Sequence, residues 1–233
     1  MRCLVTQPIH ADGLALLRAN GIEPVMAPSA DIATLVRLVP GVSAVITRDA
    51  GFSAEAFAAS DQLKIVVIHG TGHDAVDKAA ATNRGVLFAN TPGVNAQSVA
   101  EHALGLLLSL ARGIPAADKA EREGVKGFRE SRSFAELHGK TALIVGWGAI
   151  GRRFGRMLDI AFGMRVLVYS PNAPEVDGYS RCATLESGLA EADVVSLHSP
   201  MREDTRHMMN AARFAAMKPG ALLVNTARAG LVD

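Results

Sequence analysis

Residues 141–151 read TALIVGWGAIG, a short apolar run that leads into glycines at positions 146, 148 and 151. A strand, a glycine turn and a helix start in this order form the setting in which G-x-G-x-x-G binds a dinucleotide. Gly146 allows the tight turn, Gly148 lets the backbone approach a pyrophosphate, and Gly151 lets the helix pack on the strand. The helix start offers unpaired N–H groups and a partial positive charge to phosphates. A glycine-rich turn without a ligand is the alternative interpretation.

Composition narrows the class of protein. The chain has 233 residues, of which 49% are hydrophobic, and a net charge of +1, so it can bury a core of one or two domains. A basic stretch with interleaved aromatic residues is missing, and no nucleic-acid partner is expected. Residues 103–111 form the most apolar stretch, which is too short to span a bilayer, and no signal peptide or membrane association is expected. Two distant cysteines, Cys3 and Cys182, fit a reducing cytoplasm and predict neither a disulfide framework nor a metal site.

Short strand-like runs alternate with helical patterns in the first half, which predicts a parallel sheet with crossover helices. Ser53 and Asp74 are expected to begin helices, and Gly21 and Gly85 to end them. The expected strands are 3–5, 23–26, 44–47, 64–68 and 86–89, and the expected helices are about 11–20, 31–39, 53–59 and 74–83.

A long helix is predicted over residues 95–112, followed by a polar connector over 121–138. The helix is apolar around most of its circumference, which predicts that it is buried between domains or between subunits. The second half is a new α/β run, in which Gly163 is the expected end of the helix that follows the glycine motif. Its expected strands are 141–145, 165–169, 194–197 and 221–225, and its expected helices are about 150–162, 185–190 and 210–217.

Six ordered blocks stand out along the chain: LKIVVIHGTGHDAVD (63–77), AAATNRGVLFANTP (79–92), NAQSVAEHALGLLLSLAR (95–112), the glycine motif, SLHSPMREDT (196–205) and MKPGALLVNTARAGLVD (217–233). Together they resemble the D-2-hydroxyacid dehydrogenase family, which includes phosphoglycerate, glyoxylate and hydroxypyruvate reductases. The resemblance covers the whole chain and implies reversible hydride transfer between a nicotinamide cofactor and a 2-keto or 2-hydroxy acid.

Arg228 follows the predicted strand 221–225, at the sheet edge where ligands of open α/β folds bind. The resemblance implies that it is the catalytic arginine that binds the substrate carboxylate and keto oxygen, for which a planar fork of donors is suited. The loop containing Thr71 and Gly72 is implied to donate backbone N–H groups to the carboxylate. Arg48 is a candidate for the far end of the substrate. A surface salt bridge for Arg228 and a solvated rim position for Arg48 are the alternatives.

The resemblance also implies a set of cofactor contacts, in which the segment His198-Ser199-Pro200 walls the adenosine and Thr205 closes the same loop. A structural role for His198 is the alternative. The full set of implied cofactor residues is Val99, Gly146, Gly148, Ala149, Ile150, Gly151, Ser170, His198, Ser199, Pro200, Thr205, Thr226 and Ala227.

Ser170 is a departure from the expected pattern, because an acidic residue usually binds the adenosine ribose about 20 residues after the glycines. A carboxylate would repel a 2′-phosphate and serine does not, so the chain is expected to use NADP with a modest preference, or both NAD and NADP. No arginine occupies 171–174, and Arg152, Arg153 and Arg181 are the candidates to reach the phosphate.

The sequence ends at Asp233, whereas the resemblance implies a further helix, two strands, a glutamate and the histidine that protonates the keto oxygen. No residue here corresponds to that acid/base pair, so the chain as given is expected to bind cofactor and turn over poorly. The alternative is a catalytically impaired nucleotide-binding or interaction protein of the same family. An unrelated methyltransferase or sugar-nucleotide enzyme would not explain the NTARAG and SVAEH segments.

The expected architecture is α/β, with two doubly wound parallel-sheet domains. Residues 1–94 are expected to form a flavodoxin-like substrate domain, and residues 95–233 an NAD(P)-binding Rossmann domain lacking its last elements, with the active cleft between them. The resemblance implies a homodimer through helix 95–112. The substrate is expected to be a small 2-keto or 2-hydroxy acid, whose identity the sequence leaves open.

Overall fold

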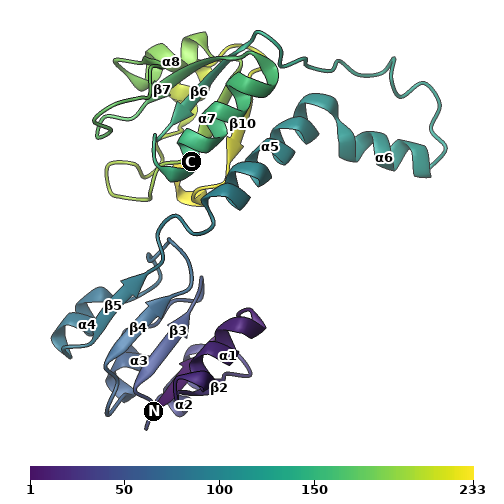
Figure 1. Ribbon diagram of the computed structural model, residues 1–233. Coiled ribbons are helices and arrows are strands. Elements are labelled where there is room, and N and C mark those ends of the chain that lie inside the picture. Colours follow the sequence, from purple (N-terminus) through teal and green to yellow (C-terminus); the bar gives the residue numbers. More distant parts are fainter. The chain divides into compact units, whose positions relative to one another are not determined.

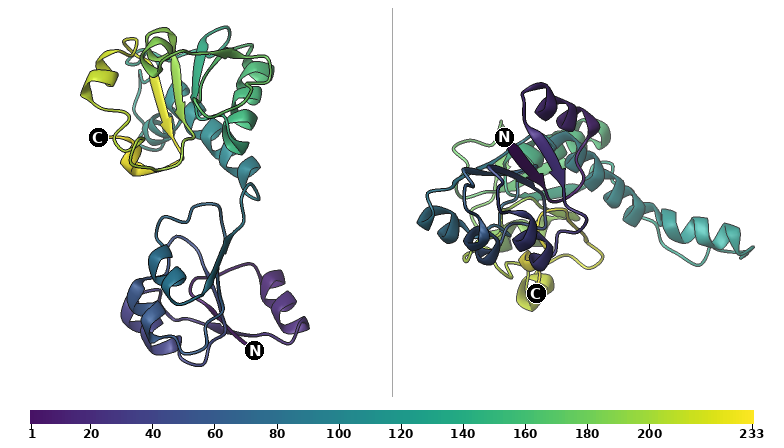
Figure 2. Two further views of the ribbon diagram at one scale, coloured as in Figure 1. Left: turned by 90° about the vertical axis from the view of Figure 1, so that its left-hand side faces the viewer. Right: turned by 90° about the horizontal axis from the view of Figure 1, so that it is seen from below.

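A parallel five-stranded sheet forms the centre of each of two units, Met1–Asn95 and Ala96–Asp233 (Figures 1 and 2). The computed structural model describes all residues from 1 to 233. Helices connect most of the consecutive strands, and every neighbouring pair of strands is parallel. The predicted fold class, two doubly wound parallel sheets, is confirmed.

The first unit has the strand order β2-β1-β3-β4-β5, which is the flavodoxin-like order. Apolar residues that alternate along β3 and β4 are fully buried, and they form one core with Phe52 and Phe57, whose rings meet edge to face. The strands are β1 (Arg2–Val5), β2 (Glu23–Met26), β3 (Ala44–Thr47), β4 (Ile65–Ile68) and β5 (Leu87–Asn90), and the helices are α1 (Ala11–Ala19), α2 (Ile32–Leu38), α3 (Ala54–Ala59) and α4 (Lys78–Asn83).

The start of α4 corrects one sequence-based expectation. Asp77, not Asp74, caps this helix, because the Asp77 carboxylate accepts a hydrogen bond from the backbone N–H of Ala80 at 2.8 Å. The preceding residues are drawn into an isolated β-bridge between Val76 and Phe52, which a local pattern does not reveal. Ser53 caps α3 as predicted, through its hydroxyl and the Ala56 N–H.

The second unit has the strand order β10-β9-β6-β7-β8. Counted from its own first strand this is 5-4-1-2-3, the Rossmann order read in reverse. The strands are β6 (Thr141–Val145), β7 (Arg165–Tyr169), β8 (Ser180–Arg181), β9 (Val194–Leu197) and β10 (Leu222–Asn225), and the helices are α5 (Ala96–Arg112), α6 (Ile114–Arg122), α7 (Ala149–Phe162), α8 (Leu185–Glu191), α9 (Ala211–Ala215) and the 3₁₀ turn η1 (Ala229–Leu231).

Strand β6 is buried on both faces, as the continuous apolar run predicts. Ala142 and Ile144 contribute to a core with residues of α5 and α7, whereas Leu143 and Val145 contribute to a second core with residues of α8. The alternation places α5 and α7 on one face of the sheet and α8 on the other. Gly163 ends α7 in a left-handed conformation, as predicted.

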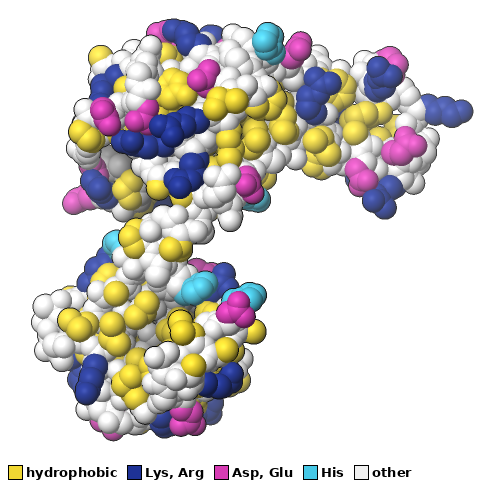
Figure 3. Space-filling view, viewed as in Figure 1, with side chains coloured by type: hydrophobic (Ala, Val, Ile, Leu, Met, Phe, Trp, Pro, Cys, Tyr) yellow, Lys and Arg dark blue, Asp and Glu magenta, His cyan; other side chains and the backbone are white.

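Helix α5 buries only one face within the chain, so its apolar circumference is not covered all round. The buried residues are mainly alanines, which let the helix approach α7 and β10 closely, while Leu106 and Leu110 stay exposed. Hydrophobic side chains form an extended surface along α5 and α6 in Figure 3. Helix α6 was not predicted, and it projects from the body of the second unit (Figures 1 and 2).

None of the helices has the combination of length and hydrophobicity that crossing a bilayer requires.

Candidate dinucleotide site

The glycine turn lies between β6 and α7, at the point where the strand order of the second unit reverses. Gly146 has a φ of +99°, and a Cβ there would stand 2.8 Å from the carbonyl carbon of His198. A Cβ on Gly151 would stand 2.1 Å from the carbonyl oxygen of Gly146, so α7 packs directly on the turn. A Cβ on Gly148 would meet nothing within 4 Å, so this backbone faces open space. Gly146 and Gly151 therefore lie where no side chain fits, as the motif predicts, and the approach of a pyrophosphate to Gly148 stays a prediction.

The N-terminus of α7 is not capped by a side chain. Its N-cap residue is Gly148, whereas a side chain caps each of α2, α3, α4, α8 and α9. The first N–H groups of α7, including those of Ala149 and Ile150, therefore keep their capacity to bind an anion, and the helix dipole favours negative charge there.

A pocket of about 470 Å³ opens at the carboxyl ends of β6, β7 and β9. Open α/β sheets bind their ligands at this edge, in the crevice where the strand order reverses. Seven residues implied as cofactor contacts line it: Gly146, Gly148, Ser170, His198, Ser199, Pro200 and Thr205. The other implied residues of this unit, Val99, Ala149, Ile150, Gly151, Thr226 and Ala227, do not line it.

His198 is held in the wall of this pocket. Its Nε2 lies 2.9 Å from the Ser196 hydroxyl, and its ring packs against Phe154. Burial lowers the pKa of His198 to about 4, so the imidazole is neutral near pH 7. The Nδ1 atom is buried without a hydrogen-bond partner. This neutral ring is suited to pack against and hydrogen-bond to a ligand rather than to act as a general acid.

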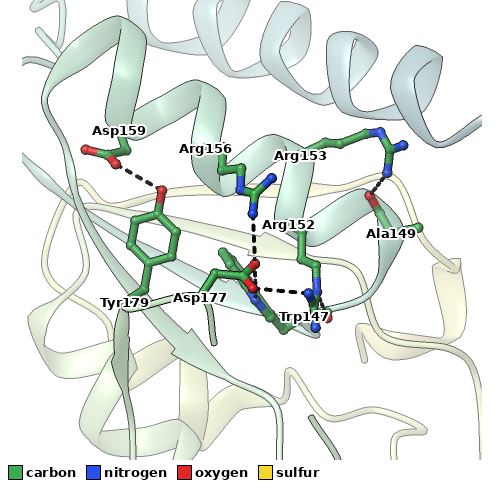
Figure 4. Close-up of polar contacts among 8 residues, drawn as sticks. All are labelled: Trp147, Ala149, Arg152, Arg153, Arg156, Asp159, Asp177 and Tyr179. Atoms are coloured by element: carbon green, nitrogen blue, oxygen red, sulfur yellow. Dashed lines mark hydrogen bonds and ion pairs between the residues drawn. The ribbon is translucent and has the colours of Figure 1, made fainter. Parts of the chain in front are cut away.

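The arginines that were candidates for a 2′-phosphate have other partners. Arg152 pairs with Asp177 at 3.2 Å, and Figure 4 shows that Arg156 approaches the same carboxylate from the next turn of α7. Arg153 donates to the carbonyl of Ala149. Arg181 donates to two backbone carbonyls of the turn that follows β7.

Trp147 is fixed between the glycine turn and α7. Its Nε1 donates to Asp177 at 3.2 Å, its ring meets Tyr179 edge to face, and a Cβ on Gly155 would stand 2.8 Å from the indole. The indole therefore holds the 170–181 loop against α7, beside the pocket that it lines.

Arg228 lies just beyond β10, in a loop that Asn225 braces. The Asn225 side chain donates to the Arg228 carbonyl at 2.8 Å and accepts from the Ala227 N–H at 3.0 Å. The Arg228 side chain is exposed, and its Nη1 donates to the carbonyl of Ala227. The Thr226 hydroxyl is buried without a hydrogen-bond partner, so this loop, like His198, has an unsatisfied polar atom that a ligand could satisfy.

In the first unit, Arg48 lies just after β3 and its guanidinium donates to the Pro8 carbonyl at 3.0 Å. The 70–72 loop is joined to the segment after β5, because Asn90 donates to the Thr71 carbonyl at 2.8 Å. No hydrogen-bond partner is found for the backbone N–H groups of Thr71 and Gly72. These groups are therefore free for an external acceptor.

Several pocket residues were not singled out from the sequence: Trp147, Asn172, Leu185, Arg202, Met208 and Arg213. The signal for Asn172 was its place in the turn after β7. Arg213 belongs to α9, far along the chain, and only the fold brings it to the pocket.

The fold and the pocket define the second unit as a dinucleotide-binding α/β domain. Residues 104–233 match the family described as D-isomer specific 2-hydroxyacid dehydrogenase, NAD binding domain. The chain is 36% identical over 233 residues to a hydroxypyruvate reductase of Thermotoga maritima, and it covers 76% of that protein. It is 35% identical over 237 residues to a D-3-phosphoglycerate dehydrogenase of Archaeoglobus fulgidus and covers 45% of it.

The structure of the TT0316 protein from Thermus thermophilus is also similar, with a TM-score of 0.92 and 36% identity over the whole chain, which covers 76% of that structure. The chain belongs to the D-isomer specific 2-hydroxyacid dehydrogenase family. Its reaction class is therefore NAD-linked oxidoreduction of a 2-hydroxy acid.

Proposed function

We propose that this chain binds NAD(P)(H) in the pocket of the second unit and a small 2-keto or 2-hydroxy acid beside Arg228. The observation that carries the proposal is the uncapped start of α7 beside a glycine turn that tolerates no side chain at positions 146 and 151. When bound, the nicotinamide supplies the hydride. Titration of the chain with NADH, NADPH and ADP-ribose tests the proposal, and saturable binding of none of them contradicts it.

In the second unit, the guanidinium of Arg228 is proposed to bind the substrate carboxylate. In the first unit, the N–H groups of Thr71 and Gly72 and the side chain of Arg48 are proposed as substrate-binding groups. The exposed side chains of Arg228 and Arg48, and the lack of a backbone acceptor for the N–H groups of Thr71 and Gly72, support this assignment. Arg228→Met should weaken the binding of glyoxylate or hydroxypyruvate to the NADH-loaded chain by about 30- to 100-fold, since charge-assisted hydrogen bonds are lost. Arg206→Met, at another exposed arginine of the second unit, is the control and should bind normally. Equal binding by both variants would remove Arg228 from the site.

Cofactor choice is proposed to be dual, with a modest preference for NADPH. Ser170 contributes no negative charge to the pocket, and Arg202 is the arginine of the pocket lining whose side chain makes no hydrogen bond or ion pair. Arg213, the other one, is bound to Glu186 and to the Met208 carbonyl. Arg202→Met should therefore weaken the binding of NADPH more than the binding of NADH. The proposed preference for NADPH is contradicted if NADH binds the wild-type chain as tightly as NADPH or more tightly.

Turnover by residues 1–233 is proposed to be slow. The glutamate and histidine implied by the resemblance correspond to none of these residues, and His198 is neutral and turned toward Ser196. General acid–base catalysis typically contributes about 10²- to 10⁴-fold, so the rate should be lower by about that factor than in a relative that has the pair. Robust oxidation of NADH by this chain with a 2-keto acid would contradict this proposal.

Assembly and compartment are proposed from two further observations. Leu106, Leu110 and Ile114 are exposed along α5 and α6, which supports a homodimer through the helix at 95–112. Cys3 and Cys182 are both free, which agrees with a protein of the reducing cytoplasm.

A further inference from the structure

Arg181 joins the two ends of a turn in the cofactor pocket. Its Nη1 donates to the carbonyl of Ser170 and its Nη2 to the carbonyl of Ala173, each at 2.7 Å. The turn itself is closed by one backbone hydrogen bond, from the Ala173 N–H to the Ser170 carbonyl at 3.2 Å. The guanidinium therefore supplies two of the three hydrogen bonds that residues 170–174 make.

The turn makes no other hydrogen bond, and its further support is the packing of Ala173 against the hydrophobic core that contains Trp147 and Phe154. Pro171 and Pro174 lack an N–H and cannot donate. All five residues of this segment, 170–174, line the pocket, so its conformation sets the shape of one pocket wall.

The backbone of Arg181 is itself anchored. Strand β8 has two residues and pairs with β7 only through Leu167–Ser180 and Val168–Arg181. From that position the side chain extends along β7 to the turn that follows it. This bidentate contact thus connects the sheet to the pocket wall, and it engages two of the donors that a phosphate would otherwise need.

Building on the proposed function, we propose that Arg181 is a positioning residue: it fixes the Ser170–Ala173 turn against which the adenosine half of the cofactor binds, without contacting the cofactor. A residue acting in this way strengthens the binding of every ligand that contains adenosine diphosphate. An arginine that bound the 2′-phosphate would strengthen the binding of NADPH alone.

The test compares Arg181→Met with Arg181→Lys and Arg165→Met. Arg165 starts β7 at the opposite edge of the sheet and pairs with Glu191. Arg165→Met is therefore the same substitution as Arg181→Met, made away from the pocket. Loss of two hydrogen bonds to backbone carbonyls should raise the Kd of Arg181→Met by about tenfold for ADP-ribose, NADH and NADPH alike. Lysine cannot span both carbonyls and should restore only part of the affinity, and Arg165→Met should bind as the wild type does.

Two results would overturn the inference: unchanged affinity in Arg181→Met, or a loss confined to NADPH. Where turnover is measurable, the effect should fall on the KM for the cofactor and leave kcat unchanged, whereas a change in kcat alone would count against it. Failure of the wild-type chain to bind ADP-ribose would instead contradict the proposed function, so the two failures are distinguishable.

Discussion

The backbone of His198 lies directly against Gly146, at a distance that leaves no room for a side chain. A Cβ on residue 146 would stand 2.8 Å from both the carbonyl carbon and the carbonyl oxygen of His198 and 2.9 Å from the N atom of Ser199. The ends of β6 and β9 are adjacent because these strands pair where the strand order reverses. The glycine turn and the segment His198-Ser199-Pro200 therefore form one pocket wall, although they lie far apart in the sequence.

Gly146→Ala and Gly148→Ala should separate folding from binding. Alanine at 146 combines a positive φ with a clash against backbone and should lower the free energy of unfolding by about 2–5 kcal/mol. Gly148 has an extended backbone (φ −88°, ψ −164°) and free space at its Cβ, so alanine should fold normally. The Gly148→Ala variant should nevertheless bind NADH more weakly, because the added methyl group occupies space at the start of α7.

Thermal unfolding and NADH titration of both variants check this pair. A Gly148→Ala protein that binds NADH as tightly as the wild type would show that the cofactor does not approach the turn. An unaltered melting temperature in Gly146→Ala would contradict the close contact with His198.

His198 should make stability depend on pH. Its pKa falls from 6.5 to about 4 on folding. Between these two pH values the unfolded chain therefore binds a proton at His198 that the folded chain does not bind. The free energy of unfolding therefore has its full value with respect to His198 above pH 6.5. It decreases by about 3 kcal/mol in total as the pH falls toward 4. His198→Gln should flatten the pH dependence of unfolding free energy across this window, whatever its own effect at neutral pH.

Denaturant unfolding from about pH 7 to about pH 4.5 measures this slope. An identical slope in wild type and His198→Gln would mean that His198 titrates normally in the folded protein.

Asp177 should couple more strongly to Arg152 than to Arg156. The carboxylate is 15% exposed, whereas the arginines are 35% and 58% exposed, and Arg152 is the closer partner. Double-mutant cycles with Asp177→Asn should give a coupling energy of about 1 kcal/mol with Arg152→Gln and under about 0.5 kcal/mol with Arg156→Gln. Asparagine accommodates the φ of +52° at this position. The reverse order of coupling energies would show that the network is arranged differently in solution.

The proposed dimer should depend on the exposed face of α5. Leu110 is 54% exposed there, and Leu110→Lys should place two charges in the interface and shift the protein toward a monomer of 24.4 kDa. Ile160, which is 84% exposed on α7, offers a matched control, and Ile160→Lys should leave the native mass unchanged. Light scattering after size exclusion gives the mass, and a wild-type monomer at all concentrations would exclude this assembly.

Local patterns predicted the elements that their own residues determine. Strands β6, β7 and β9 are short, largely apolar runs with turns at their ends, and they were placed to the residue. Helix α6 was missed because its composition is polar and its start consists of Gly113 and Pro115. The predicted start of α4 was wrong because Val76 pairs with Phe52, which lies far earlier in the chain. The glycine motif and Ser170 could be placed at the pocket edge from strand ends, but the partners of Arg152 and Arg181 depend on a loop that carries no periodicity.

Trp147 allows the central claim, cofactor binding in the second unit, to be tested directly. It is the single tryptophan of the chain, and it lines the pocket within the glycine motif. Titration of the 233-residue chain with NADH, with Trp147 emission as the readout, should give saturable quenching that ADP-ribose reverses by competition. Emission that changes only in proportion to added NADH, without saturation or competition, would contradict a dinucleotide site in this pocket.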